Sequence, residues 1–118
     1  CEVIIEVKLL LFRHNMSTHT YLIVTEQINE RIGSGDVPTL LGGDFNARPD
    51  SKVITEVMKN WQRICDQSNT YPAEGPTIKI DYLFGLPQNK WNVKSFKVLS
   101  NPEVSDHMAL FAEVEFVK

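Results

Sequence analysis

Residues 39–46 read Thr-Leu-Leu-Gly-Gly-Asp-Phe-Asn, an apolar run that ends in two glycines and then in polar side chains. A short apolar run of this kind is consistent with a central β-strand. Because side chains alternate along a strand, Asp44 and Asn46 should lie on one side and Phe45 should turn to the core. Glycine also lets a backbone or a ligand come close. A plain turn after the strand is the alternative, since Asp and Asn favour turns.

The residues on either side of this run predict alternating helices and strands. Apolar residues at helical spacing indicate one helix over 21–32, with Gly33 as its C-cap. A second helix is expected from 49–51 onward, with an apolar stripe formed by Val53, Ile54, Val57, Met58 and Trp61. Strands are expected at 3–12, 39–43, 78–84, 91–99 and 110–117, with 66–77 as a loop. The order β-α-β-α-β-β-β predicts an α/β fold with one mixed β-sheet and helices on one face.

Two further polar clusters accompany predicted strands. Asp81 lies inside the apolar run Ile80-Asp81-Tyr82, where burial is costly unless a histidine or a metal pairs with the carboxylate. The alternative is an edge-strand Asp that faces water. Asp106 and His107 follow Ser105 directly before the last strand, where a carboxylate and an imidazole can bind metal and transfer protons. Here the alternative is a solvated loop.

Together the clusters fit the hydrolysis of a phosphoester, which needs a positioned water, a base and positive charge near the phosphate. His107 could be the base, and Asp81 could orient it and stabilise its charged form. Asp106 could hold a hard cation such as Mg²⁺, which prefers oxygen ligands. Asp44 could hold or polarise water, and Asn46 could donate to a phosphate oxygen.

Three segments in this order resemble the endonuclease/exonuclease/phosphatase family of the DNase I-like superfamily. They are Gly-Asp-Phe-Asn at 43–46, continued by Ala-Arg-Pro-Asp-Ser, Ile-Asp-Tyr-Leu-Phe at 80–84, and Ser-Asp-His at 105–107; the resemblance extends from roughly 28 to 116. It implies a Mg²⁺-dependent (or Mn²⁺-dependent) phosphoester hydrolase. The expected catalytic residues are Asp44, Asn46, Asp81, His107 and His14, the expected metal ligands are Asp106 and Asp44, and the expected substrate-binding residues are Asn46 and Arg48.

The chain also departs from the family pattern, which is a four-layer α/β/β/α sandwich in a chain about twice this length. The family's metal-binding Glu, usually in a Gln-Glu pair, has no counterpart here. No Thr-His-Leu motif ends the first strand, so His14 and His19 both stand as candidates for the phosphate-contacting histidine. We therefore expect residues 1–118 to be the C-terminal half of such a domain, truncated at its N-terminus. Its exposed sheet face would need the missing half or a second copy to cover it.

Charge and composition favour some substrate classes over others and indicate a soluble protein. A net charge of −3 and a pI near 5.6 favour small or exposed phosphoesters over non-specific binding to duplex DNA. The two cysteines provide neither a disulfide framework nor a zinc site, and Cys65 is expected to be buried. We find no signal peptide and no apolar run of about 18 residues, so a soluble protein is expected, in a compartment that stays open.

Three functions compete at this point. The first is a phosphodiesterase or phosphatase, with sphingomyelinase-like and deadenylase-like branches favoured over DNA repair nucleases. The second is a catalytically incomplete fragment that acts as a binding or structural module. The third is a calcium-binding module, since Asp44-Phe45-Asn46 begins like a calcium loop, although the later acidic ligands are missing.

Overall fold

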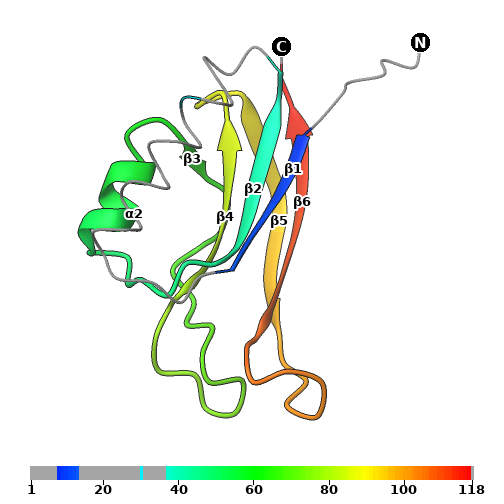
Figure 1. Cartoon of the computed structure of the whole chain (residues 1–118). Helices are drawn as coiled ribbons and strands as arrows, with labels where there is room; N and C mark the ends of the chain where they lie inside the picture. Colours follow the sequence, from blue (N-terminus) through cyan, green and yellow to red (C-terminus); the bar gives the residue numbers. More distant parts are fainter. Residues whose placement is uncertain (1–7, 14–29, 31–36, 118) are drawn as a thin grey trace.

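The computed structural model describes residues 8–13, 30 and 37–117. Within them lie strands β1 (Lys8–Arg13), β2 (Thr39–Asp44), β3 (Gln62–Arg63), β4 (Asp81–Leu86), β5 (Trp91–Leu99) and β6 (Ala109–Phe116), and helix α2 (Lys52–Val57), as Figure 1 shows. The strands expected around 39, 81, 91 and 110 are therefore present, with ends shifted by up to three residues. Of the helix expected over 21–32, only Glu30 lies in the described part, and it is helical.

The first four strands form one mixed sheet in the order β1-β2-β4-β3. β1 pairs with β2 in parallel, whereas β2 and β3 both pair with β4 in antiparallel fashion. In this register Asp44, the last residue of β2, lies opposite Asp81, the first residue of β4. The sheet thus makes cross-strand neighbours of two carboxylates that are far apart in sequence.

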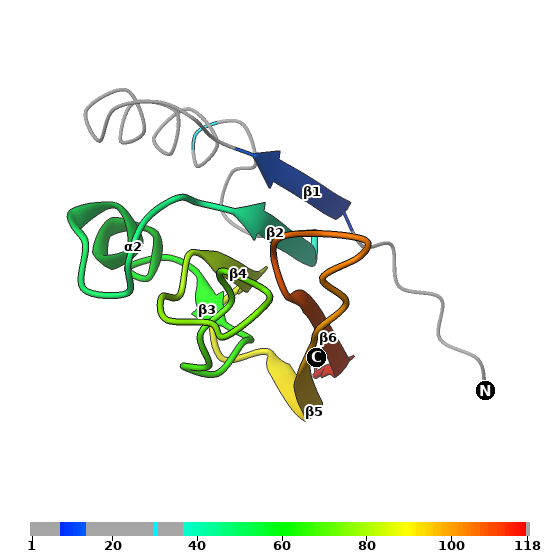
Figure 2. The same ribbon diagram turned by 90° about the horizontal axis from the view of Figure 1, so that it is seen from below.

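β5 and β6 do not join this sheet, so the expectation of a single sheet was wrong. Among the described residues they pair with each other alone and form a second, two-stranded sheet, the β5–β6 hairpin. The chain turns out of the first sheet at Trp91, whose indole N–H donates to the Leu86 carbonyl (3.1 Å). The Trp91 backbone N–H donates to the side-chain oxygen of Gln62 (3.2 Å), and the Trp91 carbonyl accepts the Gln62 side-chain N–H (2.7 Å). Figure 2 shows the resulting order of layers: α2, the four-stranded sheet, and the hairpin.

Helix α2 covers one face of the four-stranded sheet. Ser51 caps its N-terminus, since its hydroxyl accepts the Ile54 N–H at 3.3 Å. The helix ends at Val57, earlier than the apolar stripe suggested. Trp61 lies beyond the helix but is 1% exposed, as a core residue should be. Met58 is 38% exposed, so its predicted place in the core was wrong; as the C-cap residue it leaves the buried side of the helix.

The core on the α2 side is closely packed. Its members combine the helix stripe with inward side chains of β2 and β4: Leu41, Phe45, Val53, Ile54, Val57, Trp61, Cys65, Tyr82, Phe84 and Leu86. Phe45 meets the rings of Tyr82 and Phe84 edge to face, with centroids 5.6 and 5.5 Å apart. Cys65 is a free thiol, 4% exposed, in agreement with the sequence-based expectation.

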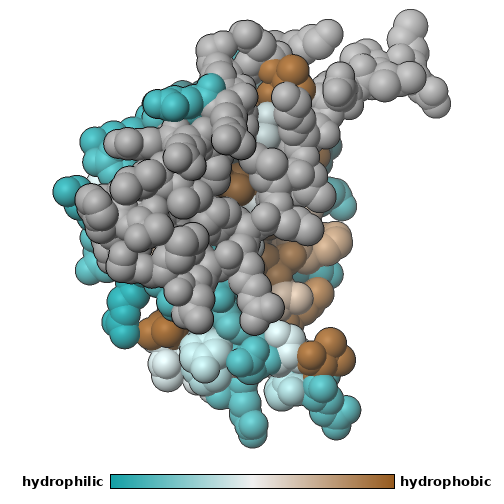
Figure 3. All heavy atoms as spheres, viewed as in Figure 1, coloured by the Kyte–Doolittle hydropathy of each residue, from teal (hydrophilic) through white to brown (hydrophobic). Residues whose placement is uncertain are grey.

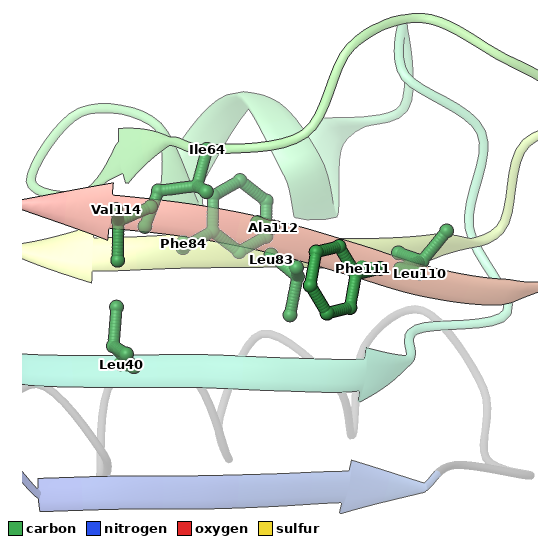
Figure 4. A pocket seen from close by; sticks show the side chains of 8 residues that line it. All are labelled: Leu40, Ile64, Leu83, Phe84, Leu110, Phe111, Ala112 and Val114. Carbon is green, nitrogen blue, oxygen red and sulfur yellow. The ribbon is translucent and has the colours of Figure 1, made fainter. Parts of the chain in front are cut away.

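The opposite face of the sheet looks toward the hairpin and encloses an apolar pocket of about 260 Å³. Figure 4 shows side chains of β2, β4 and β6, with Ile64, around it: Leu40, Ile64, Leu83, Phe84, Leu110, Phe111, Ala112 and Val114. Phe111 is 46% exposed. In Figure 3 apolar atoms gather over β6, whereas the described atoms near α2 are mainly hydrophilic. The hairpin side is therefore the less completely buried half of the fold.

None of the helical segments in the described part of the chain has the length and apolar content needed to traverse a bilayer. The same residues supply one helical layer and two sheets. The four-layer sandwich of which this chain was expected to form half stays a prediction.

Candidate active site

Three side chains from separate elements meet at one end of the four-stranded sheet. Asp44 closes β2, Asp81 opens β4, and His107 lies two residues before β6. One ligand atom from each lies within 4.8 Å of the others. Phe45 and Tyr82, the neighbours of the two aspartates, are buried on the α2 side. Because side chains alternate along a strand, this packing turns both carboxylates to the hairpin side, where His107 arrives.

Asp81 and His107 form a hydrogen-bonded pair. Nδ1 of His107 lies 2.9 Å from Oδ2 of Asp81, and Asp81 is only 8% exposed. This contact directs Nε2 toward Asp44, whose Oδ2 lies 3.8 Å away. The His107 backbone N–H donates to the Ser105 hydroxyl (3.1 Å), which fixes the turn that carries the ring. The partner that the buried Asp81 required is thus present.

The acidic surroundings change the proton affinity of His107. Burial alone would lower its pKa, but the hydrogen bond to Asp81 opposes burial, and so do the charges of Asp81, Asp44 and Asp106. The net effect raises the pKa of His107 above its usual value of 6.5. A ring with a raised pKa near a carboxylate is suited to hold and release a proton around neutral pH.

The segment around Asp44 is a tight, partly exposed turn. Gly43 has a φ of 145°, and Asn46 adopts a left-handed φ of 46°. The Asn46 backbone N–H donates to Oδ1 of Asp44 at 2.8 Å, so the carboxylate is held on one side by its own loop. Asn46 itself is exposed. This stretch therefore forms the turn that Asp and Asn favour, while the site roles of Asp44 and Asn46 stay predictions.

Arg48 is exposed and lies beside a second, polar hollow of about 200 Å³. That hollow is lined by Arg48, Pro49, Asp50, Gln67, Asn69, Thr77, Ile78 and Lys79. The Tyr82 hydroxyl ties its two sides together, because it lies 2.7 Å from the Ala47 carbonyl and 3.2 Å from the Lys79 carbonyl. Burial raises the pKa of Tyr82, so the hydroxyl keeps its proton and remains a donor.

The structure does not gather every predicted site residue. Asp106 is exposed and does not belong to the Asp44–Asp81–His107 group. Its backbone carbonyl accepts the Ala73 N–H at 2.7 Å, and its charge acts on His107. His14 and His19 lie outside the described residues. The metal-binding role of Asp106 and the phosphate-contacting role of His14 stay predictions.

Sequence reasoning also missed residues that shape the site. Thr70 and Lys79 are 0% and 2% exposed, and both bond the start of β4. Lys79 Nζ donates to the Asp81 carbonyl (2.9 Å) and lies 4.7 Å from the centre of the Tyr82 ring. A lysine inside the apolar run before Asp81 was a usable signal, because a buried ammonium needs acceptors. Nothing in the loop sequence distinguishes Thr70.

The side chains of Asp44, Asp81 and His107 are of the types that bind divalent cations. Two carboxylates and an imidazole lie close enough to share an ion. Nδ1 of His107 is already engaged by Asp81, so a hard cation such as Mg²⁺ would rely on carboxylate oxygens. Asp44 offers such oxygens at a side chain that is 24% exposed. Its second oxygen, Oδ2, faces the imidazole.

The sequence and the structure of this chain are both similar to those of one protein family. Residues 10–107 match the Endonuclease/Exonuclease/phosphatase family. Among solved structures, a functionally unknown conserved protein from Enterococcus faecalis V583 is similar at 26% identity and a TM-score of 0.74, over 92% of this chain and 49% of that one. An endonuclease/exonuclease/phosphatase from Bacteroides vulgatus is similar at 25% identity and a TM-score of 0.60, over 82% and 42%.

A mannosyl-6-phosphatase from Bacteroides thetaiotaomicron shares the fold at 23% identity and a TM-score of 0.62, over 82% of this chain and 45% of that one. The chain thus spans about half the length of these solved structures. No functionally curated protein matched the chain.

Proposed function

This chain belongs to the endonuclease/exonuclease/phosphatase family, whose members are hydrolases acting on phosphoesters, and we propose that it contributes the Asp–His half of an active site for divalent-cation-dependent hydrolysis of a phosphate ester. The observation that carries this proposal is the 2.9 Å contact between Asp81 and His107, with Nε2 directed at Asp44. The match over residues 10–107 includes all three residues.

In the proposed reaction, water attacks the phosphorus atom and the alcohol leaves with a proton. Nε2 of His107 takes a proton from the attacking water, for which the imidazole must first be neutral. Asp81 keeps the Nδ1 proton on the far side of the ring and stabilises the imidazolium that forms. Asp44 orients the water, and the side chains of Asn46 and Arg48 bind the non-bridging phosphate oxygens. His14 would add a further phosphate contact.

A bound Mg²⁺ or Mn²⁺ would neutralise the charge that develops on the phosphate oxygens. Asp44 and Asp106 are the proposed ligands. The metal-binding Glu that the family resemblance implies has no counterpart in the sequence, so further oxygen ligands would come from water, from substrate, or from a partner.

A small phosphoester is the proposed substrate class. The net charge of −3 gives no general attraction to duplex DNA, and the hollow beside Arg48 is polar and small, at about 200 Å³. A sugar phosphate belongs in the test panel, since one structurally similar protein is described as a mannosyl-6-phosphatase.

The half-length match favours one competing function, a catalytically incomplete module that works only with a partner. The chain covers 42–49% of its solved relatives, and its hairpin side is incompletely buried. We propose that a missing N-terminal half or a second copy of the chain covers that side. The molar mass of the folded sample in solution distinguishes these partners.

The test is hydrolysis of bis-p-nitrophenyl phosphate, p-nitrophenyl phosphate and mannose 6-phosphate, with Mg²⁺, with Mn²⁺ and with EDTA. The expected result is metal-dependent turnover that falls about 100-fold or more in His107→Ala, the loss typical of a removed acid–base group. Asp81→Asn should also lose activity. Asp66→Asn is its matched control, because Asp66 is an exposed carboxylate that accepts the Ser68 N–H and does not belong to the Asp44–Asp81–His107 group.

Equal turnover in wild type and His107→Ala would contradict the assignment of the base. A folded, monodisperse chain without turnover on any substrate would favour the incomplete module. In that case the same assay is repeated on a longer gene product that contains residues 1–118.

A further inference from the structure

We propose that Thr70 is a positioning residue that holds Asp81 and His107 at hydrogen-bonding distance. Asp81 and His107 are 26 residues apart and belong to different elements, so their side chains meet only if two stretches of backbone are fixed relative to each other. The inference deepens the proposed function, and only its kinetic readout rests on that function.

Thr70 fixes the start of β4. It is 0% exposed, and its Oγ1 accepts the backbone N–H groups of Ile80 (3.1 Å) and Asp81 (3.2 Å). These groups lie where β4 begins, at the end of the β2–β4 ladder. Since buried N–H groups need acceptors, the hydroxyl replaces a strand partner there.

The same residue fixes the segment that carries His107. The Thr70 carbonyl accepts the backbone N–H of Met108 at 2.8 Å, one residue beyond His107. The Thr70 N–H donates to the Ile78 carbonyl, also at 2.8 Å, which anchors Thr70 itself. One buried threonine therefore bonds the backbone of Asp81 on one side and the backbone next to His107 on the other.

The residues after Thr70 reinforce this arrangement. The Tyr71 ring lies against the His107 imidazole, with centroids 4.8 Å apart at an angle of 49°. The Ala73 N–H donates to the Asp106 carbonyl at 2.7 Å. Residues 70–73 thus contact three consecutive residues, 106–108, and limit the positions that the imidazole can take. A displacement of about 1 Å in such a pair is enough to reduce a rate by about 100-fold.

The experiment compares Thr70→Val, Thr70→Ser and a matched control, Thr39→Val. Valine keeps the branched shape but removes the acceptor, whereas serine keeps the hydroxyl. Thr39 is also 0% exposed, and its hydroxyl donates to the Val37 carbonyl (2.8 Å) at the opposite end of β2 from Asp44. Both valine variants lose the hydrogen bonds of a buried threonine hydroxyl, but only Thr70→Val loses them beside Asp81.

The first readout is the imidazole ¹H–¹⁵N spectrum of His107 without metal, at a pH where the ring is neutral. Wild type, Thr70→Ser and Thr39→Val should carry the proton on Nδ1, with the downfield shift of a hydrogen-bonded group. Thr70→Val should give a mixture of tautomers and lose that shift. The second readout is kcat, expected to fall about tenfold or more in Thr70→Val with KM changed by less than about threefold.

An unchanged imidazole spectrum in folded Thr70→Val would overturn the proposal, and so would the same spectral change in Thr39→Val. If Thr70→Val does not fold, amide hydrogen exchange in wild type and Thr70→Ser decides. The backbone amides of Ile80, Asp81 and Met108 should then be protected from exchange in both proteins. Rapid exchange of these amides, with an unchanged His107 imidazole signal, would refute the positioning role of Thr70. The absence of turnover in wild type would count against the proposed function alone, because the spectra do not depend on it.

Discussion

The two faces of the four-stranded sheet differ in how completely they are packed. On the α2 face Phe45, Ile54, Tyr82 and Phe84 are at most 3% exposed. The Phe45 ring meets those of Tyr82 and Phe84 edge to face. On the hairpin face a pocket of about 260 Å³ remains between Leu40, Leu83 and the side chains of β6. The polar site lies at the end of this second face. The Asp44–Asp81–His107 group thus lies at the edge of the less filled face.

The largest effect is expected from emptying the packed face. Trp61→Ala removes a side chain that is 1% exposed and should lower the free energy of unfolding by about 3–5 kcal/mol. Met58→Ala, at a neighbouring position that is 38% exposed, should cost less than about 1 kcal/mol. Urea unfolding of both variants gives the comparison. Similar losses would mean that the burial of Trp61 does not set the stability of the α2 face.

A smaller effect is expected where the hairpin leaves the sheet. A Cβ on Gly85 would lie 2.7 Å from the Trp91 ring and 3.0 Å from Ile64, so Gly85→Ala must displace the indole that turns the chain. We expect a cost of about 1–3 kcal/mol, as for other overpacked sites. Gly42→Ala is the control, because its Cβ would meet mainly the flexible end of Leu83. Equal thermal stability of wild type and Gly85→Ala would show that this contact does not matter.

Filling the pocket should stabilise the protein slightly. Ala112→Val adds two methyl groups to the wall of the 260 Å³ pocket and should raise the free energy of unfolding by about 0.5–1 kcal/mol. The same kind of enlargement on the packed face, Val53→Leu, should lower it by about 1–3 kcal/mol. Chemical denaturation measures both. Opposite signs are the prediction, and two losses would contradict it.

The smallest effect concerns protonation at the site. Burial lowers the pKa of His107, but the bond to Asp81 and three nearby carboxylates raise it by more, so NMR titration of the metal-free chain should give a pKa above 6.5. Asp81→Asn should lower that pKa. Because the folded-state pKa is the higher one, protonated His107 stabilises the fold fully below pH 6.5 and loses this contribution as pH rises through the folded pKa. A pKa at or below 6.5 in wild type would exclude the described pairing.

Sequence reasoning was most successful where a local pattern has one physical cause. Alternation in β2 placed Phe45 in the core, and the cost of burying a carboxylate predicted a partner for Asp81. It failed for Met58, because a helical stripe does not mark where the helix ends. It also missed β3, since a strand of two residues has no periodicity to detect.

The sequence by itself determined the family and the need of Asp81 for a partner such as His107. Each motif has a local requirement: an apolar strand, a turn, or a carboxylate in need of a partner. Tertiary structure alone decided that β5 and β6 form a separate layer. Alternating side chains are equally compatible with a neighbour in the same sheet and with a sheet stacked on it. It also decided that Thr70 bonds both sides of the Asp81–His107 pair, because hydrogen bonds between distant backbone groups leave no pattern in the order of the residues.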